Sequence, residues 1–375
     1  MEKYQICTRC VMDTTDPEIV FDSDGVCNHC TNAIERLKQP PYGLPPKEKE
    51  AALNQLIEDV KKAGKGKQYD CIIGLSGGVD SSYVAYLVKE WGLHPLAIHL
   101  DNGWNLELAV KNIENVCKIL DIDLYTDILD WEEFKDLQLA FLKASTPDSE
   151  IPTDNLIISS LYQAAGRRGI KYILTGYNTA SESILARAWS QGHFDKTYIS
   201  AVYKQFGTLR RKLSFHILST WEMLVKRLCG TKLISTLDYI SYNKEEAKII
   251  MNEQFGWKDY GRKHGESNYT RIFQEYILPV KFGFDKRKAH FSSLIAAGQM
   301  TREEAIKKLS EPLYADEQSI QQDIDTLCRK FEITKDDFEK IMELPVKSIN
   351  DYQNQKNTLQ YKLYLIARWC WHLIK

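Results

Sequence analysis

A chain of 375 residues, 43% of them hydrophobic and 27% charged, is typical of a soluble globular protein with one large or two modest domains. No uninterrupted apolar run approaches the length of a membrane span, and the start of the chain lacks signal-peptide character, so we expect a cytoplasmic protein. The net charge of −2 argues against a broad nucleic-acid-binding face, and nine cysteines are too few for a disulfide scaffold of this size.

Residues 1–38 carry two cysteine pairs, Cys7-x-x-Cys10 and Cys27-x-x-Cys30, with sixteen residues between them. This spacing predicts a ribbon around a zinc ion held by four thiolates. Four protein ligands leave no open coordination position, so the predicted role is structural. The alternative is four unrelated reduced thiols.

Residues 39–68 are predicted to form a linker and a helix. Two Pro-Pro pairs stiffen the segment Pro40 to Pro46, and an amphipathic helix is expected over Lys47 to Ala63.

The segment that follows predicts a buried strand, Cys71 to Leu75, that runs into a glycine turn and then a helix from Tyr83 to Trp91. Ser81 and Ser82 are expected to cap this helix, whose first N–H groups favour a phosphate. The loop lacks the lysine of a Walker motif, and Asp80 lies where phosphates would gather, which indicates a bridging metal ion. An ordinary glycine turn is the alternative. The candidate nucleotide-binding residues are Gly74, Leu75, Ser76, Gly77, Gly78, Val79, Asp80, Ser81 and Ser82.

The pattern Ser-Gly-Gly-x-Asp-Ser resembles the pyrophosphate loop of the ATP pyrophosphatase superfamily (the adenine nucleotide alpha hydrolase-like fold), which includes GMP synthetase, NAD synthetase and several tRNA-modifying enzymes. The resemblance implies cleavage of ATP between its α and β phosphates and transfer of AMP to a carbonyl or carboxyl oxygen.

Alternating strands and helices over residues 69–256 predict a parallel α/β sheet. Further strands are expected at 95–100, 123–127, 171–174 and 233–240, and helices at 107–120, 131–143, 154–168 and 244–253. The superfamily resemblance implies that the turn after the second strand cradles adenine and ribose; an ordinary surface turn is the alternative. That turn contains His99, Leu100, Asp101 and Asn102.

The fourth strand leads into a turn that is similar to the second motif of NAD synthetase-like enzymes. The resemblance implies that Thr175 and Gly176 contact nucleotide and that Glu182 binds magnesium together with Asp80. One additional residue separates Asn178 from the Ser-Glu pair, and a simple helix cap is the alternative.

Residues 257–375 are predicted to form a basic substrate- and phosphate-binding segment followed by a helical C-terminal region. Up to His290, lysine and arginine outnumber the acids, which suits a phosphate-rich site, although a solvated basic face would look the same. The later aromatic residues are expected to serve packing or self-association, which would make a homo-oligomer. They are Tyr352, Tyr361, Tyr364, Trp369 and Trp371.

Together, the cysteine pairs, the Ser-Gly-Gly-Val-Asp-Ser-Ser loop and the basic block resemble the N-acetyl-sugar amidotransferase family of bacterial surface-polysaccharide biosynthesis (lipopolysaccharide O-antigen and nonulosonic acid). The resemblance runs from Cys7 to about Ala305. It implies a ligase that uses ATP and magnesium, with structural zinc, to convert an N-acetyl group of a nucleotide-activated sugar into an acetamidino group. Its expected catalytic residues are Asp80, Lys281, Arg287 and Lys288, and its weaker sugar-contact candidates are His264, Glu266 and Arg271.

Such a reaction needs ammonia. Position 2 is Glu, and no cysteine lies in a Gly-x-Cys-x-Gly elbow, so we expect a separate glutaminase. In this family that partner resembles the paired glutaminase and cyclase-like, ammonia-channelling subunits of imidazole glycerol phosphate synthase.

Two other functions stay open at this point. A tRNA-thiolating enzyme would need a sulfur-carrying cysteine near the ATP, whereas Cys71 lies in a strand and the others are isolated. A non-catalytic module that binds ATP and docks through its zinc ribbon is the second alternative.

Overall fold

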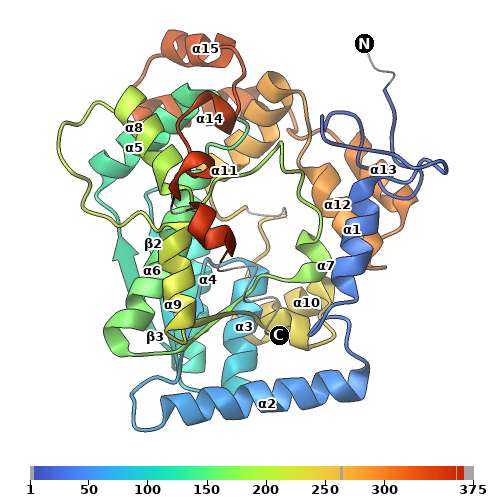
Figure 1. Ribbon diagram of the computed structural model, residues 1–375, viewed down its shortest axis with the longest axis vertical. Coiled ribbons are helices and arrows are strands. Elements are labelled where there is room, and N and C mark those ends of the chain that lie inside the picture. The colour runs from blue at the N-terminus through green and yellow to red at the C-terminus, as the bar shows by residue number, and fades with distance from the viewer. Residues whose placement is uncertain (1–3, 262–264, 360, 367–375) are drawn as a thin grey trace.

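A parallel sheet of five strands, in the order β3-β2-β1-β4-β5, lies at the centre of the protein (Figure 1). The computed structural model describes residues 4–261, 265–359 and 361–366. The strands are β1 (Cys71–Gly74), β2 (Pro95–Asp101), β3 (Asp123–Ile128), β4 (Tyr172–Thr175) and β5 (Lys232–Ser235). The predicted α/β fold with an N-terminal ribbon and a helical C-terminal region is confirmed.

Helices cover both faces of this sheet and continue into the C-terminal region. Those of the α/β part are α3 (Val79–Glu90), α4 (Glu107–Leu120), α5 (Trp131–Ala144), α6 (Ile151–Arg168), α7 (Thr179–Glu182), α8 (Lys196–Phe206), α9 (Thr220–Leu228), a 3₁₀ turn (Thr236–Tyr239) and α10 (Lys244–Phe255). The others are α1 (Asn28–Leu37), α2 (Pro46–Gly64), α11 (Asn268–Ile272), a π-helix (Phe273–Phe282), α12 (Arg287–Ala296), α13 (Arg302–Ser310), α14 (Glu317–Phe331), α15 (Lys335–Glu343) and 3₁₀ turns at Ile349–Asp351 and Gln355–Asn357.

The position of β1 in the middle of the sheet explains why its sequence carries no charge. Its successive side chains point to opposite faces, so Ile73 packs with Val84 of α3 and Ile113 of α4, while Ile72 packs with Leu161 of α6. Both faces of the strand are therefore covered by helices, as expected for the middle of a parallel sheet.

The strand order reverses at β1, which pairs with β2 on one side and β4 on the other. Open α/β sheets bind ligands at the carboxyl ends of the strands at such a reversal. The loops after β1 and β4 touch there, because a Cβ on Gly176 would lie 2.8 Å from the amide nitrogen of Ser81. The topology thus brings the two predicted nucleotide loops together.

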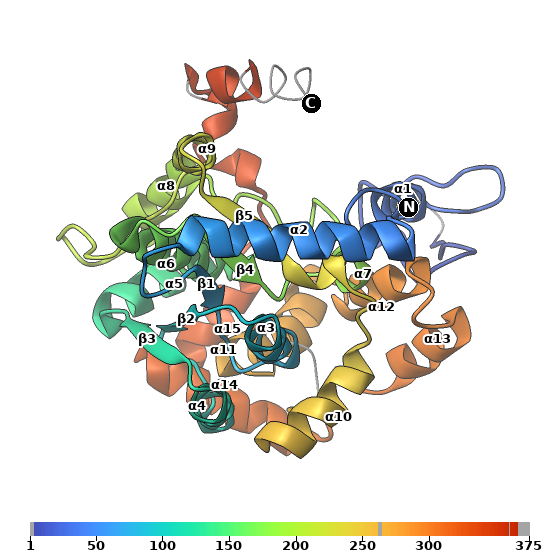
Figure 2. The same cartoon turned by 90° about the horizontal axis from the view of Figure 1, so that it is seen from below.

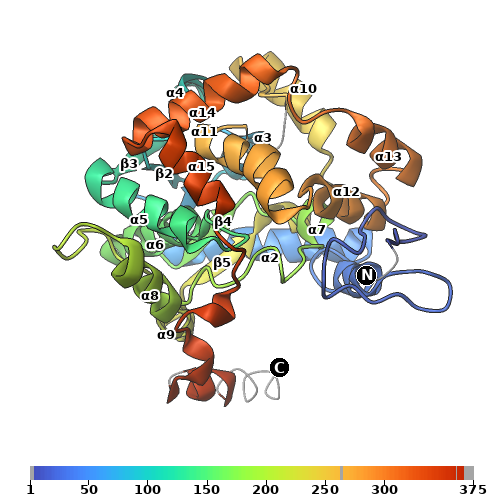
Figure 3. The same ribbon diagram turned by 90° about the horizontal axis from the view of Figure 1, so that it is seen from above.

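The N-terminal ribbon packs against part of the C-terminal region. In Figure 1, α2 runs along the bottom and α15 lies at the top, while α1, α12 and α13 gather at one side. Figure 2 and Figure 3 show the same grouping from below and from above. Among the described residues, no helix is both long enough and apolar enough to cross a membrane.

Two expectations about elements need correction. Helix α3 begins at Val79 with Gly78 as its N-cap, four residues before the predicted start, so Ser81 and Ser82 lie inside it. The strand expected over 233–240 is short and gives way to a 3₁₀ turn.

Tyr352 is a packing residue, buried with its hydroxyl donating to the Ala144 carbonyl at 2.7 Å, while Trp369 and Trp371 lie outside the described residues.

A buried polar cluster fixes the segment that leads into α6. The imidazole Nε2 of His193 lies 3.2 Å from Oδ2 of Asp148 and 3.3 Å from Oδ2 of Asp154. Nearby, Nζ of Lys286 lies 3.7 Å from Oε2 of Glu150. Burial opposes a charge on the imidazole, but the two carboxylates prevail and raise the pKa of His193 to about 10.

This cluster predicts a specific pH dependence of stability. The pKa of His193 rises from 6.5 to about 10 on folding, so its contribution is complete below pH 6.5 and is lost as the pH rises toward 10. We expect His193→Gln to lower the free energy of unfolding by about 3 kcal/mol at pH 6, measured by denaturant titration, and by much less near pH 10. The control is His94→Gln, since the His94 side chain is 76% exposed. A difference between wild type and His193→Gln that does not vary with pH would contradict this account.

Candidate active site at the sheet reversal

The loop after β1 is closed by hydrogen bonds to its own side chains and leads into the start of α3. The Ser81 hydroxyl accepts from the amide of Ser76 at 3.2 Å and donates to the carbonyl of Gly78 at 3.1 Å. The N-cap residue, Gly78, has no side chain that could accept from the first N–H groups of α3, and N–H groups at a helix start can bind an anion. Within the described part of the chain, the buried Ser82 hydroxyl has no hydrogen-bond partner.

Gly77 is the most constrained residue of the loop. Its φ is +85°, and a Cβ there would lie 2.6 Å from the carbonyl oxygen of Ala109 in α4. Its carbonyl accepts hydrogen bonds from the Trp257 indole at 2.7 Å and the Tyr260 hydroxyl at 2.8 Å. The Tyr260 hydroxyl in turn accepts from Nδ2 of Asn112 at 3.0 Å. Two residues that sequence reasoning did not single out, Trp257 and Tyr260, therefore fix the orientation of this peptide.

Asp80 is held beside a phenol and an ammonium group. The Tyr242 hydroxyl donates to Oδ1 of Asp80, and Nζ of Lys244 lies 3.9 Å from Oδ2. Burial and the carboxylate raise the pKa of Tyr242 far above its usual range, so the phenol remains a donor. The side chain of Asp80 is 22% exposed and can reach a metal ion. Sequence reasoning missed Tyr242 and Lys244, although a lysine opening a helix after a strand was a usable signal.

Of the three predicted sugar-contact residues, the structure places one beside the loop. A Cβ on Gly78 would lie 3.6 Å from Oε1 of Glu266. The backbone around Glu266 is held to the turn after β2, because the Leu106 amide donates to the Glu266 carbonyl at 2.9 Å. Arg271 instead pairs with the buried Asp323, and His264 lies outside the described residues.

The turn after β2 is built largely by its own side chains. His99 is buried and connects Leu75, whose carbonyl lies 3.0 Å from Nδ1, to Asn105, whose Nδ2 lies 3.2 Å from Nε2. Burial lowers the pKa of His99, so the neutral ring donates through Nδ1 and accepts through Nε2. Asp101 and Asn102 each accept from a backbone amide two residues later, at 2.9 and 3.1 Å. The predicted adenine and ribose contacts of this turn, including Leu100, stay a prediction.

The loop after β4 is bonded to Asp238, which follows β5, and several buried polar atoms lie in and beside it. The hydroxyl and amide of Thr179 each donate to the buried Asp238 carboxylate at 2.7 Å. Asn178 caps α7 by accepting from the Ser181 amide at 2.9 Å, as the helix-cap alternative predicted. In the described residues, Nδ2 of Asn178 and the hydroxyls of Ser181 and Thr236 are buried without hydrogen-bond partners, which suits a site that receives a polar ligand.

Two further predicted site residues, Thr175 and Glu182, lie at either end of this loop. The Thr175 hydroxyl, expected to contact nucleotide, donates to the Ile234 carbonyl at 3.0 Å. Glu182, the second magnesium candidate, ends α7, and its backbone carbonyl accepts from the Tyr177 hydroxyl at 3.3 Å. Its carboxylate is partly exposed.

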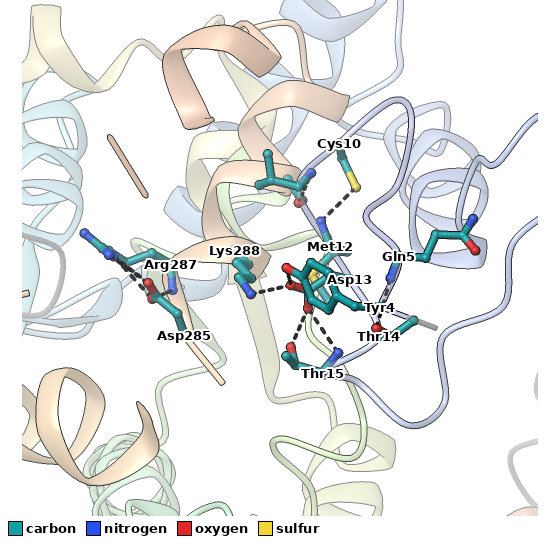
Figure 4. Close-up of polar contacts among 12 residues, drawn as sticks. Tyr4, Gln5, Cys10, Met12, Asp13, Thr14, Thr15, Asp285, Arg287 and Lys288 are labelled. Atoms are coloured by element: carbon teal, nitrogen blue, oxygen red, sulfur yellow. Dashed lines mark hydrogen bonds and ion pairs between the residues drawn. The ribbon is translucent and has the colours of Figure 1, made fainter. Parts of the chain in front are cut away.

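The three predicted phosphate-neutralising cations have structural partners. Lys281 donates to the carbonyls of Met342, in the last turn of α15, and of its C-cap Leu344, both at 3.0 Å, and burial lowers its pKa to about 8. Arg287 pairs with Asp285 at 2.8 Å, and Lys288 pairs with the ribbon carboxylate of Asp13 (Figure 4). These three cations of the basic block thus join parts of the fold, and Lys244 is a cation that lies near Asp80.

The four ribbon cysteines form a metal-binding cluster. Their Sγ atoms lie within 4.8 Å of one another and are buried. Sγ of Cys7 lies 3.8 Å from that of Cys30, and Sγ of Cys10 lies 3.7 Å from that of Cys27. Zn–S bonds of about 2.3 Å in a tetrahedron place sulfur atoms about 3.8 Å apart, so the cluster fits zinc. Backbone amides also point at Sγ of Cys7, including that of Cys10 at 3.4 Å and that of Cys27 at 3.3 Å, and they favour its thiolate.

Two parts of the chain match known families. Residues 266–367 match the C-terminal domain of WbpG-like LPS biosynthesis proteins, and residues 69–176 match the HUP domain of tRNA methyl transferases. The two matches confirm the resemblance to the surface-polysaccharide family within the ATP pyrophosphatase superfamily.

Three individual proteins that are similar to this chain share less than a third of their aligned residues with it. An uncharacterized protein of Methanocaldococcus jannaschii is 26% identical over 316 residues, which cover 82% of this chain and 93% of that protein. A tRNA-specific 2-thiouridylase of Fusobacterium nucleatum subsp. nucleatum is 29% identical over 119 residues, which cover 30% of this chain and 34% of that enzyme. An NH3-dependent NAD synthetase from Campylobacter jejuni aligns with 14% identity and a TM-score of 0.29 over 56% of this chain and 84% of that one.

The close packing around Gly77 can be tested with two alanine substitutions. Gly77→Ala places a Cβ against the Ala109 carbonyl, so we expect at least a tenfold loss of MgATP affinity and a loss of stability of about 2–4 kcal/mol. Gly66→Ala is the control, because Gly66 has a similar φ of +79° but no atom within 4 Å of the added Cβ. It should cost about 1 kcal/mol and leave MgATP affinity unchanged, as read by calorimetric titration and denaturant unfolding. Equal MgATP affinities for the two variants would contradict a steric role for the loop.

Proposed function

We propose that this chain is an ATP-dependent amidotransferase that converts the N-acetyl group of a nucleotide-activated sugar into an acetamidino group. The observation that carries the proposal is the meeting of two parts of the chain. A Ser-Gly-Gly-Val-Asp-Ser-Ser loop lies at the sheet reversal, and Glu266, at the start of the segment that matches the WbpG-like LPS biosynthesis domain, lies against Gly78 of that loop.

The proposed chemistry solves a specific difficulty, because the oxygen of an amide is a poor leaving group. The acetamido oxygen attacks the α-phosphorus of ATP, an O–P bond forms, and pyrophosphate leaves. Ammonia then adds to the activated carbon and loses a proton, the C–O bond breaks and AMP departs. The net change replaces the amide oxygen with NH. The oxygen leaves as part of AMP, so the elements of water that the reaction removes are taken up in the hydrolysis of ATP to AMP and pyrophosphate.

The roles of the residues follow from where charge develops. The first amides of α3 and the hydroxyls of Ser76 and Ser81 would hold the pyrophosphate. Asp80 and Glu182 would bind magnesium, which supplies charge neutralisation between the phosphates. Lys244, 3.9 Å from Asp80, would add positive charge to the leaving group. Zinc in the ribbon would be structural, because four thiolates fill its coordination sphere.

Ammonia would come from a separate glutaminase with a cyclase-like channelling subunit. A glutaminase needs an activated thiol, and burial raises the pKa of Cys71, of Cys117 (to about 11) and of Cys328. These thiols are poorly suited to nucleophilic catalysis. Release of glutamate from glutamine by this chain alone at a catalytic rate would disprove the need for a partner.

A tRNA-thiolating function is the second candidate, favoured by the match of residues 69–176 and by the thiouridylase relatives. That function needs a sulfur-carrying thiol near the carboxyl ends of the strands. Outside the ribbon, Cys229 is the exposed cysteine of the described residues, and it lies just before β5, at the amino end of that strand. It is therefore at the edge of the sheet away from the loop.

The role of Asp80 predicts a large effect on adenylation. Asp80→Asn removes the charge that would hold magnesium, so we expect at least a hundredfold lower rate of magnesium-dependent pyrophosphate release. Glu90→Gln is a matched control, because the exposed Glu90 ends the same helix, α3, at the opposite edge of the sheet. The control should keep its rate, and a comparable rate for Asp80→Asn would remove Asp80 from the metal site.

The proposed reaction can be tested directly with a small panel of N-acetylated UDP- and CMP-sugars, ATP, magnesium and ammonium. We expect sugar-dependent exchange of labelled pyrophosphate into ATP and a sugar product lighter by the difference between O and NH, detected by mass spectrometry. ATP binding without any exchange would favour a non-catalytic sensor. A tRNA-dependent release of pyrophosphate would favour the thiolating enzyme.

A further inference from the structure

We propose that two connections carry the position of the zinc ribbon to the loop after β4, so that the nucleotide site reaches full affinity only when the four-cysteine centre holds its metal. This inference rests on the proposed ATP site and assigns a positioning role to residues far from it. The receiving element is α7, which contains Ser181 and Glu182 and is capped by Asn178; among the described residues, Nδ2 of Asn178 and the Ser181 hydroxyl are buried without hydrogen-bond partners.

The first connection is α1, which starts inside the metal cluster. Cys27 is its N-cap and Cys30 lies in its first turn, so two of the four ligands fix where the helix begins. Near the other end, Nη2 of Arg36 donates to the Tyr177 hydroxyl at 2.5 Å, and the Arg36 guanidinium also lies over the Tyr177 ring. The Tyr177 hydroxyl then donates to the Glu182 carbonyl at 3.3 Å.

The second connection is α12, in which two adjacent serines bind opposite partners. Ser292 accepts from the amide of Val11, between the two cysteine pairs, at 3.2 Å. Ser293 accepts from the amide of Ile184, just after α7, at 2.9 Å. His290 adds a third contact, with Nδ1 3.1 Å from the Ser181 carbonyl. Both serines are fully buried, so one rigid helix contacts the ribbon on one side and α7 on the other.

Further contacts bind the ribbon tightly to this helical unit. Lys288 of α12 pairs with Asp13, which is fully buried and also accepts from the Tyr4 hydroxyl and from Thr15 (Figure 4). At the start of α13, Arg302 donates to the carbonyls of Cys7 and Cys10, both at 3.1 Å. These bonds reach the backbone of the metal ligands themselves, so the metal-bound shape of the ribbon sets where α12 and α13 rest.

Helix α7 depends on such outside support because it has only four residues. A single turn does not hold its own position, since helix formation has a costly first turn. The strand side holds it through Thr179 and Asp238, and the ribbon side holds it through Arg36, His290 and Ser293. A small ribbon of this kind is ordered by its metal, so metal loss would release the ribbon side while the sheet stays intact.

The first experiment removes the metal from the full-length protein. The chain is purified with zinc, treated with a chelator in steps, and followed by zinc content, far-UV circular dichroism and MgATP affinity. We expect MgATP to bind at least tenfold more weakly to chains that have lost zinc and kept the helical signal. Unchanged MgATP affinity in folded, zinc-free chains would overturn the inference.

The second experiment keeps the zinc and removes one hydrogen bond from each connection. It tests the positioning role even if zinc removal unfolds the chain. The double variant Arg36→Met, Ser293→Ala should retain one zinc per chain, bind MgATP at least tenfold more weakly and show faster amide exchange at Ile184. The matched control is Arg9→Met, Ser310→Ala, since Arg9 is an exposed ribbon residue and the Ser310 hydroxyl donates to the Lys307 carbonyl within α13. A double variant that retains zinc and binds MgATP like wild type would overturn the inference.

The wild-type measurement separates the two proposals. Zinc-loaded wild type that binds no MgATP would contradict the proposed function itself. Zinc-loaded wild type that binds MgATP with an affinity independent of zinc and of the two connections would contradict only the positioning role.

Discussion

The peptide that joins Gly77 to Gly78 is the constraint on which the site depends. Its carbonyl is held by the Trp257 indole and the Tyr260 hydroxyl, and the φ of +85° with a backbone atom behind it leaves no room for any residue except glycine. The proposed pyrophosphate site would rely largely on backbone amides, which cannot rotate to correct a poor fit as a side chain can. The amides must therefore be fixed in advance, and here two aromatic side chains from outside the sheet fix them.

The basic block shows how cations in a sequence can serve the fold. Lys281 and Arg287 bond to backbone carbonyls near the C-terminal ends of α15 and α13, where unpaired carbonyls carry partial negative charge. Lys288 neutralises a carboxylate that is wholly buried in the ribbon. A cation bound in this way is engaged by the fold. An excess of lysine and arginine in a segment therefore does not by itself indicate a phosphate site. Lys244, in contrast, lies outside that block and is beside Asp80.

Much of the architecture could be predicted because it depends on local patterns. The helix expected at 107–120 has those bounds, and the spacing of Cys7, Cys10, Cys27 and Cys30 was sufficient to predict their cluster. Contacts between distant segments could not be predicted in the same way. Tyr242 and Trp257 reach residues that precede them by more than 160 positions, and no periodicity of a single sequence records such pairs. The start of α3 was misplaced because serine is a favoured cap, whereas Gly78 takes that position here.

The two bonds to the Gly77 carbonyl also bear on how the protein acquires its shape during synthesis. Their donors follow Gly77 by 180 and 183 residues, so the loop leaves the ribosome long before the side chains that hold it. Local strand and helix pairs can form as the chain emerges, but contacts of such long range close late. The proposed nucleotide site would therefore be completed only after translation has passed Tyr260, when both donors to the Gly77 carbonyl have been made.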